Sequence, residues 1–133
     1  MKIAIIGSRE WSNTRKIKDL LSSLKQKFGD ELVIISGGAK DGADMYVKKY
    51  AIEFGLNYQE YNPAHTPRNL YSAMPDSYYD KPYHVTQFHH RNMLIAQACD
   101  KMVALVPGDK ITNGTRSAIK YAQKLDKPVV ILS

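Results

Sequence analysis

Two glycine-containing loops carry the residue types in this chain that are best suited to hold a phosphate group. One loop, residues 36–44, reads SGGAKDGAD, and the other, residues 107–115, reads PGDKITNGT. Each loop follows an apolar run and precedes a helical pattern, so unpaired N–H groups at a helix start would face it. Backbone without bulky side chains approaches a ligand closely, and such N–H groups favour an anion. The two loops together predict a nucleotide-binding pocket.

A third turn of the same kind follows the first apolar run of the chain. Gly7 permits a sharp turn, and Ser8 and Arg9 come directly after it. The guanidinium of an arginine binds phosphate through two parallel hydrogen bonds, and the serine adds a hydroxyl. We therefore predict that this turn contributes ligand contacts rather than an exposed surface arginine.

Other polar residues have more than one interpretation. Asp44 falls in the first turn of a predicted helix, where a carboxylate either stabilises the helix N-terminus or binds a ribose hydroxyl. Arg91 and Asn92 are predicted at the start of another helix, where a cation is disfavoured unless an anion is bound. His89 and His90 precede them, but adjacent side chains point in different directions and are interpreted as surface histidines. We expect no metal and no cofactor.

The predicted ligand-binding residues all lie in these loops and helix starts. They are Gly7, Ser8, Arg9, Ser36, Gly37, Gly38, Ala39, Asp44, Arg91, Asn92, Pro107, Gly108, Asn113, Gly114 and Thr115. The strongest phosphate site is predicted where the amides of Gly114, Thr115 and Arg116 open a helix. The alternative there is ordinary helix capping by Asn113 or Thr115.

The elements that must position these residues alternate regularly along the chain. Apolar runs occupy 3–6, 32–35, a weaker 57–61, 102–106 and 129–132, and helical patterns fall between them at 14–28, 43–54, 93–97 and 118–125. Strands this apolar, separated by helices, predict an α/β domain with a five-stranded parallel sheet covered on both faces. The expected strand order is 3-2-1-4-5, and ligands bind such sheets beyond the carboxyl ends of the strands. All three loops should therefore converge on one site.

Residues 62–85 interrupt this alternation. The segment has no clean period and is rich in proline and tyrosine, with Tyr71, Tyr78, Tyr79 and Tyr83 among its residues. A loop this long inside a compact domain is usually functional or mobile. Tyrosine rings could close over a nucleotide base. Two other interpretations remain open: a surface insertion that buries its own aromatic rings, or a dimer contact.

Composition limits the class of protein. The chain has 133 residues, which suits one domain over residues 1–133, and it is 44% hydrophobic and 24% charged. No apolar run approaches the ~20 residues of a membrane helix. The single cysteine, Cys99, excludes an intrachain disulfide and favours a cytoplasmic location. The net charge of +6 suits nucleic acid or merely a basic surface. Because the lysines are spread over predicted helix faces, we favour the solvated surface.

Taken in order, the motifs resemble one known superfamily. IIGSR at 5–9, SGGA at 36–39 with GAD at 42–44, RNM at 91–93 and GT at 114–115 resemble the SLOG superfamily, most closely its small stand-alone YspA/YpsA-like branch. The resemblance spans nearly the whole chain. It implies a Rossmann-like fold that binds a nucleotide or a nucleotide-derived phosphorylated small molecule, often as a dimer.

The chain departs from one related group, the Lonely Guy phosphoribohydrolases, which carry PGGxGTxxE. Here extra residues separate Pro107-Gly108 from Gly114-Thr115, and Ala118 stands at the glutamate position. Glycosidic hydrolysis needs a carboxylate to activate water or to steady the ribose cation, and alanine can do neither. Standard phosphoribohydrolase activity is therefore not expected. A substitute carboxylate would have to come from Asp44, Asp109 or Glu10, and the resemblance makes Arg91 a further catalytic candidate.

Three functional hypotheses follow. The first is a module that binds a phosphorylated, nucleotide-derived ligand as a sensor or a sequestering protein. The second is a nucleotide hydrolase of phosphoribohydrolase type with a non-standard carboxylate. The third, and weakest, is a nucleic-acid-binding protein, by analogy with DNA-processing protein A in the same superfamily and from the charge of +6.

Overall fold

Five parallel strands form one sheet in the order β3-β2-β1-β4-β5, in a computed structural model that describes residues 1–133. The strands are β1 (Lys2–Gly7), β2 (Val33–Ser36), β3 (Asn57–Glu60), β4 (Lys101–Leu105) and β5 (Val129–Leu132). In the centre of the sheet, Ile3 of β1 is in register with Ile34 of β2 and with Lys101 of β4. The strand order predicted from the sequence is thus confirmed.

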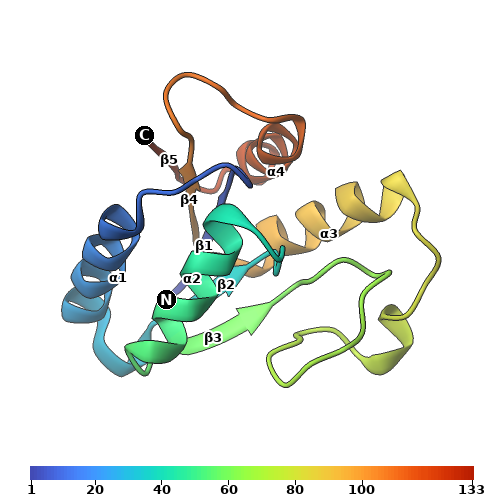
Figure 1. Ribbon diagram of the computed structural model, residues 1–133, viewed down its shortest axis with the longest axis horizontal. Coiled ribbons are helices and arrows are strands. Elements are labelled where there is room, and N and C mark those ends of the chain that lie inside the picture. The colour runs from blue at the N-terminus through green and yellow to red at the C-terminus, as the bar shows by residue number, and fades with distance from the viewer.

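Four helices cover the two faces of this sheet. They are α1 (Thr14–Phe28), α2 (Gly42–Glu53), α3 (Val85–Ala98) and α4 (Asn113–Lys124), and two short 3-10 turns, η1 (Gly29–Glu31) and η2 (Asp76–Tyr78), lie between elements. Helices α1 and α2 pack on one face, and α3 and α4 on the other (Figure 1). The amino terminus of α1 is capped by Asn13, whose Oδ1 accepts from the Lys16 N–H at 3.1 Å.

The two faces of β1 belong to two separate hydrophobic clusters. Ile3 and Ile5 pack with Leu21 of α1 and Val47 of α2. On the opposite face, Ala4 and Ile6 pack with Ile95 and Ala96 of α3 and with Ala118 and Ile119 of α4. Burial on both faces explains why this strand is an unbroken apolar run. No helix is long and apolar enough to cross a membrane.

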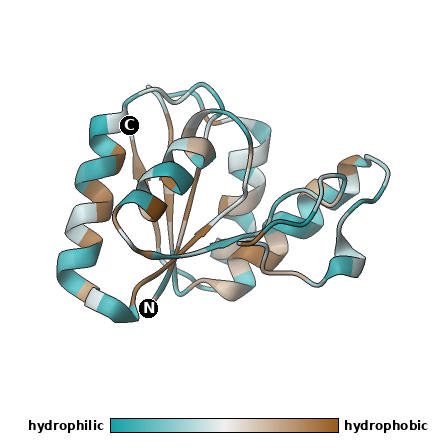
Figure 2. Ribbon diagram, turned by 60° about the horizontal axis from the view of Figure 1, so that its bottom comes forward, coloured by the Kyte–Doolittle hydropathy of each residue, from teal (hydrophilic) through white to brown (hydrophobic).

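Helix α3 begins two turns earlier than the sequence indicates. It starts at Val85, where the Nδ1 of His84 accepts from the Thr86 N–H at 3.2 Å. The first turns extend beyond the edge of the sheet together with the preceding segment (Figure 2), so they need no apolar stripe. Arg91 therefore lies inside the helix and not at its start. The expectation of a cation misplaced at a helix N-terminus is wrong.

One buried carboxylate links the irregular segment 61–84 to the domain, alongside backbone hydrogen bonds from the Tyr61 N–H to Ser36 O and from the Ala73 N–H to Glu60 O. Glu60, at the end of β3, is only 1% exposed. Its carboxylate lies 3.1 Å from Lys48 Nζ, accepts from the Tyr58 hydroxyl at 2.9 Å and accepts from the side-chain amide of Asn69. A buried charge with an ion-pair partner and hydrogen bonds to both of its oxygens is well satisfied. This network therefore anchors the first part of the segment.

Candidate functional site

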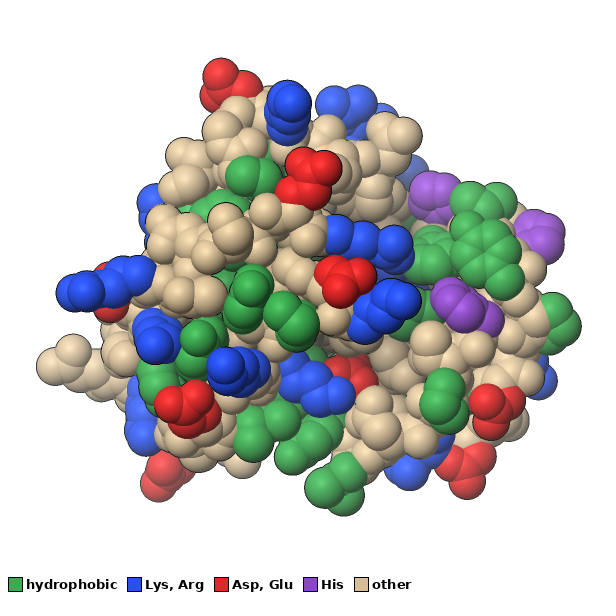
Figure 3. Space-filling model, viewed as in Figure 1, with side chains coloured by type: hydrophobic (Ala, Val, Ile, Leu, Met, Phe, Trp, Pro, Cys, Tyr) green, Lys and Arg blue, Asp and Glu red, His purple; other side chains and the backbone are tan.

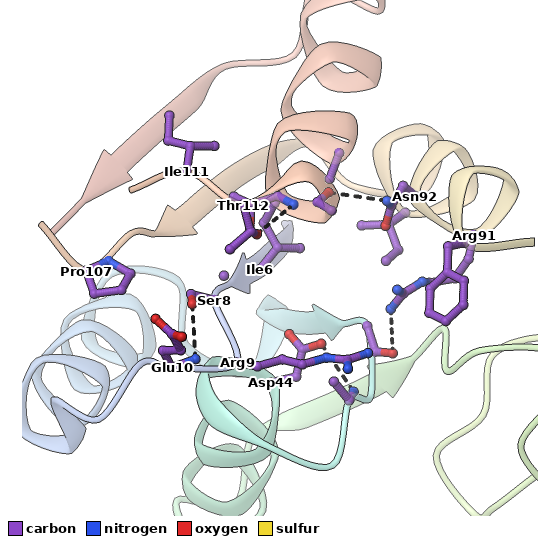
Figure 4. A pocket seen from close by; sticks show the side chains of 18 of the residues that line it. Ile6, Ser8, Arg9, Glu10, Asp44, Arg91, Asn92, Pro107, Ile111 and Thr112 are labelled. Atoms are coloured by element: carbon purple, nitrogen blue, oxygen red, sulfur yellow. Dashed lines mark hydrogen bonds between the residues drawn. The ribbon is translucent and has the colours of Figure 1, made fainter. Parts of the chain in front are cut away.

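The turn after β1, the loop after β2 and the loop after β4 surround one cavity at the carboxyl edge of the sheet (Figure 4). The cavity has a volume of about 430 Å³, which is within the range of small-molecule sites. It is lined by Ile6, Gly7, Ser8, Arg9, Glu10, Gly37, Ala39, Asp44, Phe88, Arg91, Asn92, Ile95, Pro107, Lys110, Ile111, Thr112, Gly114, Thr115 and Ala118. The three loops thus meet at one place, as their positions in the sequence indicate.

Most of the predicted ligand-binding residues line this cavity, but several do not. Ser36, Gly38, Gly108 and Asn113 lie outside the lining. Among the carboxylates considered for catalysis, Asp44 and Glu10 line the cavity, whereas Asp109 is exposed and does not. Of the three candidate carboxylates, Asp44 is therefore the one that lines the cavity and is also buried.

Gly38 shapes the loop instead of facing the ligand space. Its φ is +65°, a conformation that other residues rarely adopt, and an added Cβ would lie 2.5 Å from Glu60 Cγ. Its N–H donates to Ser36 Oγ at 3.3 Å. This amide is therefore used within the loop and is not available to a phosphate.

Arg91 reaches across from α3 to the loop after β2. Its Nη1 donates to the carbonyl oxygen of Gly37 at 2.8 Å, and its guanidinium carbon lies 5.4 Å from the centre of the Phe88 ring. Its Nε is buried without a hydrogen-bond partner. Burial lowers the pKa of Arg91 and the negative charge of Asp44 opposes that shift, yet an arginine stays protonated in a protein. The site therefore holds a fixed positive charge whose Nε–H has no partner.

Asp44 supplies the opposite charge from the first turn of α2. Its side chain is buried, and Oδ2 accepts from the Ala39 N–H at 3.2 Å. Oδ1 is buried without a partner. Burial raises the pKa of Asp44, while the positive charge of Arg91 and the Ala39 hydrogen bond act to lower it. Asp44 and Arg91 flank Gly37 without forming an ion pair. Each therefore keeps one buried polar atom without a hydrogen-bond partner at the wall of the cavity.

The start of α4 offers fewer free amides than the sequence suggests. The N-cap is Thr112, and neither Asn113 nor Thr115 takes that role. The hydroxyl of Thr112 accepts from the Thr115 N–H at 3.4 Å, and its carbonyl accepts from the Arg116 N–H at 2.9 Å. Of the three amides expected to hold a phosphate, only that of Gly114 is unpaired; the neighbouring Asn113 amide is also free.

The turn after β1 is held rigidly against its neighbours. Ser8 is buried, and its Oγ accepts from the Glu10 N–H at 3.0 Å. Its backbone N–H donates to Leu105 O of β4 and its carbonyl accepts from the Ala43 N–H of α2. Arg9 follows with an exposed side chain that extends along the edge of the site past Asp44 (Figure 4). A fixed backbone thus places an exposed cation at the mouth of the cavity.

Sequence reasoning missed the aromatic wall of the cavity. Phe88 lines it, together with Ile95 from the same helix, and no predicted tyrosine does so. Phe88 could have been found only if α3 had been extended to Val85. Tyr78 and Tyr79 pack edge to face at 4.9 Å, so the segment buries part of its own aromatic surface. The expectation that tyrosines close over the ligand does not describe this structure.

Ala118 occupies the wall where the phosphoribohydrolase pattern has a glutamate. It is 1% exposed and faces the cavity beside Ile111 and Ile6. A methyl group at this position makes the wall apolar and places no carboxylate there. Lys110, which the sequence analysis did not single out, lines the same region and adds a cation.

Outside the cavity, charges of both signs are mixed. On the face seen in Figure 3, basic and acidic side chains alternate over the left part of the molecule, and histidines gather with hydrophobic side chains on the right. There is no dense basic field on this face.

Comparisons with known proteins agree with the motif analysis. The model of a family described as YspA, cpYpsA-related SLOG family matches residues 1–66. No curated protein matches the chain in sequence.

Several solved structures share the fold. DNA processing protein A from Helicobacter pylori, which binds single-stranded DNA, has a TM-score of 0.71 at 24% identity over 100% of this chain, which spans 65% of the length of that chain. The molybdenum cofactor binding protein of Rippkaea orientalis has a TM-score of 0.68 at 20% identity over 98% of this chain and 74% of its own. A Moco carrier protein from Chlamydomonas reinhardtii has a TM-score of 0.64 at 22% identity over 98% of this chain and 75% of its own. At sequence identities of 20% to 24%, these similarities show that the proteins share a fold with this chain and no more than that.

Proposed function

Residues 1–66 make this chain a member of the YspA, cpYpsA-related SLOG family, and from that membership we propose that the cavity binds a nucleotide or a phosphorylated, nucleotide-derived small molecule. The protein would act as a sensor or as a sequestering module for that ligand. The observation that carries the proposal is the convergence of Arg9, Arg91 and Lys110 with the free Gly114 amide of α4 around one cavity.

The charge of the cavity favours an anion. Three cations line it against two carboxylates, Asp44 and Glu10. The unpaired amide of Gly114 adds the partial positive charge of a helix N-terminus. Phosphate is the anion that such a combination of guanidinium groups and backbone N–H donors binds best.

The remaining walls suit a nucleoside. The Phe88 ring lies under the Arg91 guanidinium at 5.4 Å and offers a flat apolar surface to a base. Ile95, Ile111 and Ala118 continue that apolar wall. Asp44 lines the cavity, and we assign its carboxylate as the acceptor for a ribose hydroxyl.

One observation favours a second function, cleavage of the bound nucleotide. Asp44 is a buried carboxylate with a raised pKa in a cavity that also holds Arg91, a combination found at catalytic sites. A protonated carboxyl group could donate a proton to a leaving group. The Ala118 methyl counts against the standard mechanism, so any hydrolysis would depend on Asp44.

A thermal-shift panel tests both functions. Nucleoside monophosphates, ADP-ribose, cyclic nucleotides and the molybdenum cofactor (which two of the similar structures bind or carry) are each added, and hits are recovered by chromatography. A ligand at a hundredfold its Kd adds about 2.7 kcal/mol. For a chain of this size that raises the melting temperature by about 8–10 °C. An intact ligand supports binding alone, a cleaved ligand supports the hydrolase, and no shift with any compound contradicts both.

A pair of arginine variants shows whether the shift comes from this cavity. Arg9→Ala removes an exposed cation at the cavity mouth and should weaken ligand binding about tenfold or more, since a hydrogen bond to a charged group contributes about 1.5–3 kcal/mol. Arg15→Ala removes another exposed arginine, on α1, whose Nε lies 3.7 Å from Asp19 Oδ2. Equal effects of the two variants would place the ligand elsewhere.

A further inference from the structure

A second groove lies beside the cavity, on the outer side of α4. It is lined by His89, Asn113, Arg116, Ser117, Lys120, Tyr121 and Lys124. It reaches the first turn of α4 at Asn113, next to Gly114, which lines the cavity. The groove and the cavity are therefore neighbours that share one helix start. None of these residues lines the cavity.

The groove carries positive charge with no compensating carboxylate. Arg116, Lys120 and Lys124 are exposed, and none of them forms an ion pair. The whole of α4 contains no acidic residue, and neither does α3, which forms the other side of the groove. The other two helices each include a carboxylate among their cations, Asp19 in α1 and Glu53 in α2. Arg116, Lys120 and Lys124 follow one another along α4 without a carboxylate among them, so they create a local site for an anion.

The spacing of these cations follows a chain of anions. Arg116, Lys120 and Lys124 recur every four residues, so they form one stripe along the helix with steps of about 6 Å. A single phosphate would span one step and so contact at most two neighbouring cations of that stripe. A polymer with regularly repeated phosphates would engage all three.

The groove also presents rings. Tyr121 is half-buried, packs against the hydrophobic core on one side and lines the groove on the other. His89 lines the opposite wall, where its Nδ1 lies 3.0 Å from Ser117 Oγ and so fixes the ring relative to α4. A charged track with aromatic rings is the combination that binds single-stranded nucleic acid, because only unpaired bases expose faces for stacking.

We infer that the α3–α4 groove binds the backbone of a single-stranded nucleic acid, with phosphates on the stripe Arg116, Lys120 and Lys124 and a base against Tyr121. This site is separate from the proposed nucleotide cavity, although a strand that follows α4 towards its amino terminus reaches the cavity mouth. Three phosphate contacts on a single strand give a slope of about −2 for log affinity against log salt. Affinity should then fall about 15- to 20-fold between 50 and 200 mM salt.

The test is fluorescence anisotropy of the full chain with a labelled eight-nucleotide oligothymidine at both salt concentrations. The variant Lys120→Gln/Lys124→Gln should bind about tenfold more weakly at 50 mM salt and lose about two thirds of the salt slope. The matched control, Lys27→Gln/Lys49→Gln, removes the same charge from exposed positions on α1 and α2 and should keep both. Tyr121→Leu, with its fold checked by thermal unfolding, should weaken binding at least fivefold.

Three results would overturn the inference. They are an absence of oligonucleotide binding at 50 mM salt, equal losses in the two lysine pairs, and equal affinity for duplex and single strand. Equal losses would show attraction to the net charge alone. Mononucleotide binding is measured in the same proteins, and the Lys120→Gln/Lys124→Gln variant should retain it. This measurement therefore distinguishes a failure of the groove proposal from a failure of the nucleotide-cavity proposal.

Discussion

The Nη1 of Arg91 lies 2.8 Å from the carbonyl oxygen of Gly37, a contact between residues 54 positions apart. It joins α3, on one face of the sheet, to the loop that begins α2, on the other face. Asp44 approaches the same glycine from α2, so Gly37 separates a half-buried cation from a buried carboxylate. The site is assembled around this glycine.

Removing the Arg91 side chain should lower the stability of the folded protein. In Arg91→Ala the Gly37 carbonyl loses its donor and the buried Asp44 loses its nearest cation. An unpaired buried polar group costs about 1–3 kcal/mol, and we expect that fall in the free energy of unfolding from urea titration. Arg15→Ala, on the solvated face of α1, should stay within about 0.5 kcal/mol. Equal stability of the two variants would show that the Gly37 contact contributes nothing.

The free energy of unfolding should depend on pH through Asp44. Its pKa is raised in the folded protein by burial, so the unfolded chain releases this proton first as pH rises. Stability is therefore lost from the unfolded value near pH ~4 up to the raised folded value, at about 1.4 kcal/mol per pH unit.

The variant Asp44→Asn removes this dependence. Its unfolding free energy, minus that of the wild type, should increase with pH across that window and then become constant. Urea titrations from pH 4 to pH 8 measure the difference, and the exposed Asp41→Asn variant serves as the control, with a difference within about 0.5 kcal/mol throughout. A constant difference for Asp44→Asn would contradict the raised pKa.

Two glycines of the cavity should respond differently to alanine. A Cβ on Gly37 would overlap the Arg91 guanidinium and lie 2.9 Å from Asp44 Oδ2, whereas a Cβ on Gly114 would meet nothing within 4 Å. Gly37→Ala should lose about 1–3 kcal/mol of stability and should displace Arg91. Gly114→Ala lies at a helix start without positive φ and should be neutral or stabilising by up to about 1 kcal/mol. Thermal unfolding of both variants distinguishes these cases.

The irregular segment should loosen when its anchor is neutralised. Glu60→Gln removes the charge that faces Lys48 and changes the hydrogen bonds with Tyr58 and Asn69. We expect a loss of about 1–3 kcal/mol and faster tryptic cleavage within residues 61–84, because local opening exposes the backbone to protease. The exposed Glu53→Gln on α2 should match the wild type in both measurements. Unchanged cleavage of Glu60→Gln would show that the segment is held by other contacts.

The sequence by itself determined the sheet and the place of the site. Apolar runs such as 3–6 and 102–106 must be buried on both faces, so they specify parallel strands between helices. Glycine-rich turns at their carboxyl ends then have to meet, because parallel strands direct those ends to one edge. These features are local or follow from chain order, so no tertiary contact is needed to predict them.

Only the tertiary structure decided which groups face the ligand space. The α3 turns that carry Phe88 extend beyond the sheet and therefore lack an apolar stripe (Figure 2). The spacing of apolar residues in the sequence consequently does not reveal this part of the helix. Two further contacts join distant segments. Arg91 donates to the carbonyl of Gly37, and His89 of α3 lies beside Ser117 of α4, next to the stripe of cations. Burial and hydrogen-bond partners are properties of the packed molecule, and they determine which polar atoms remain free to bind.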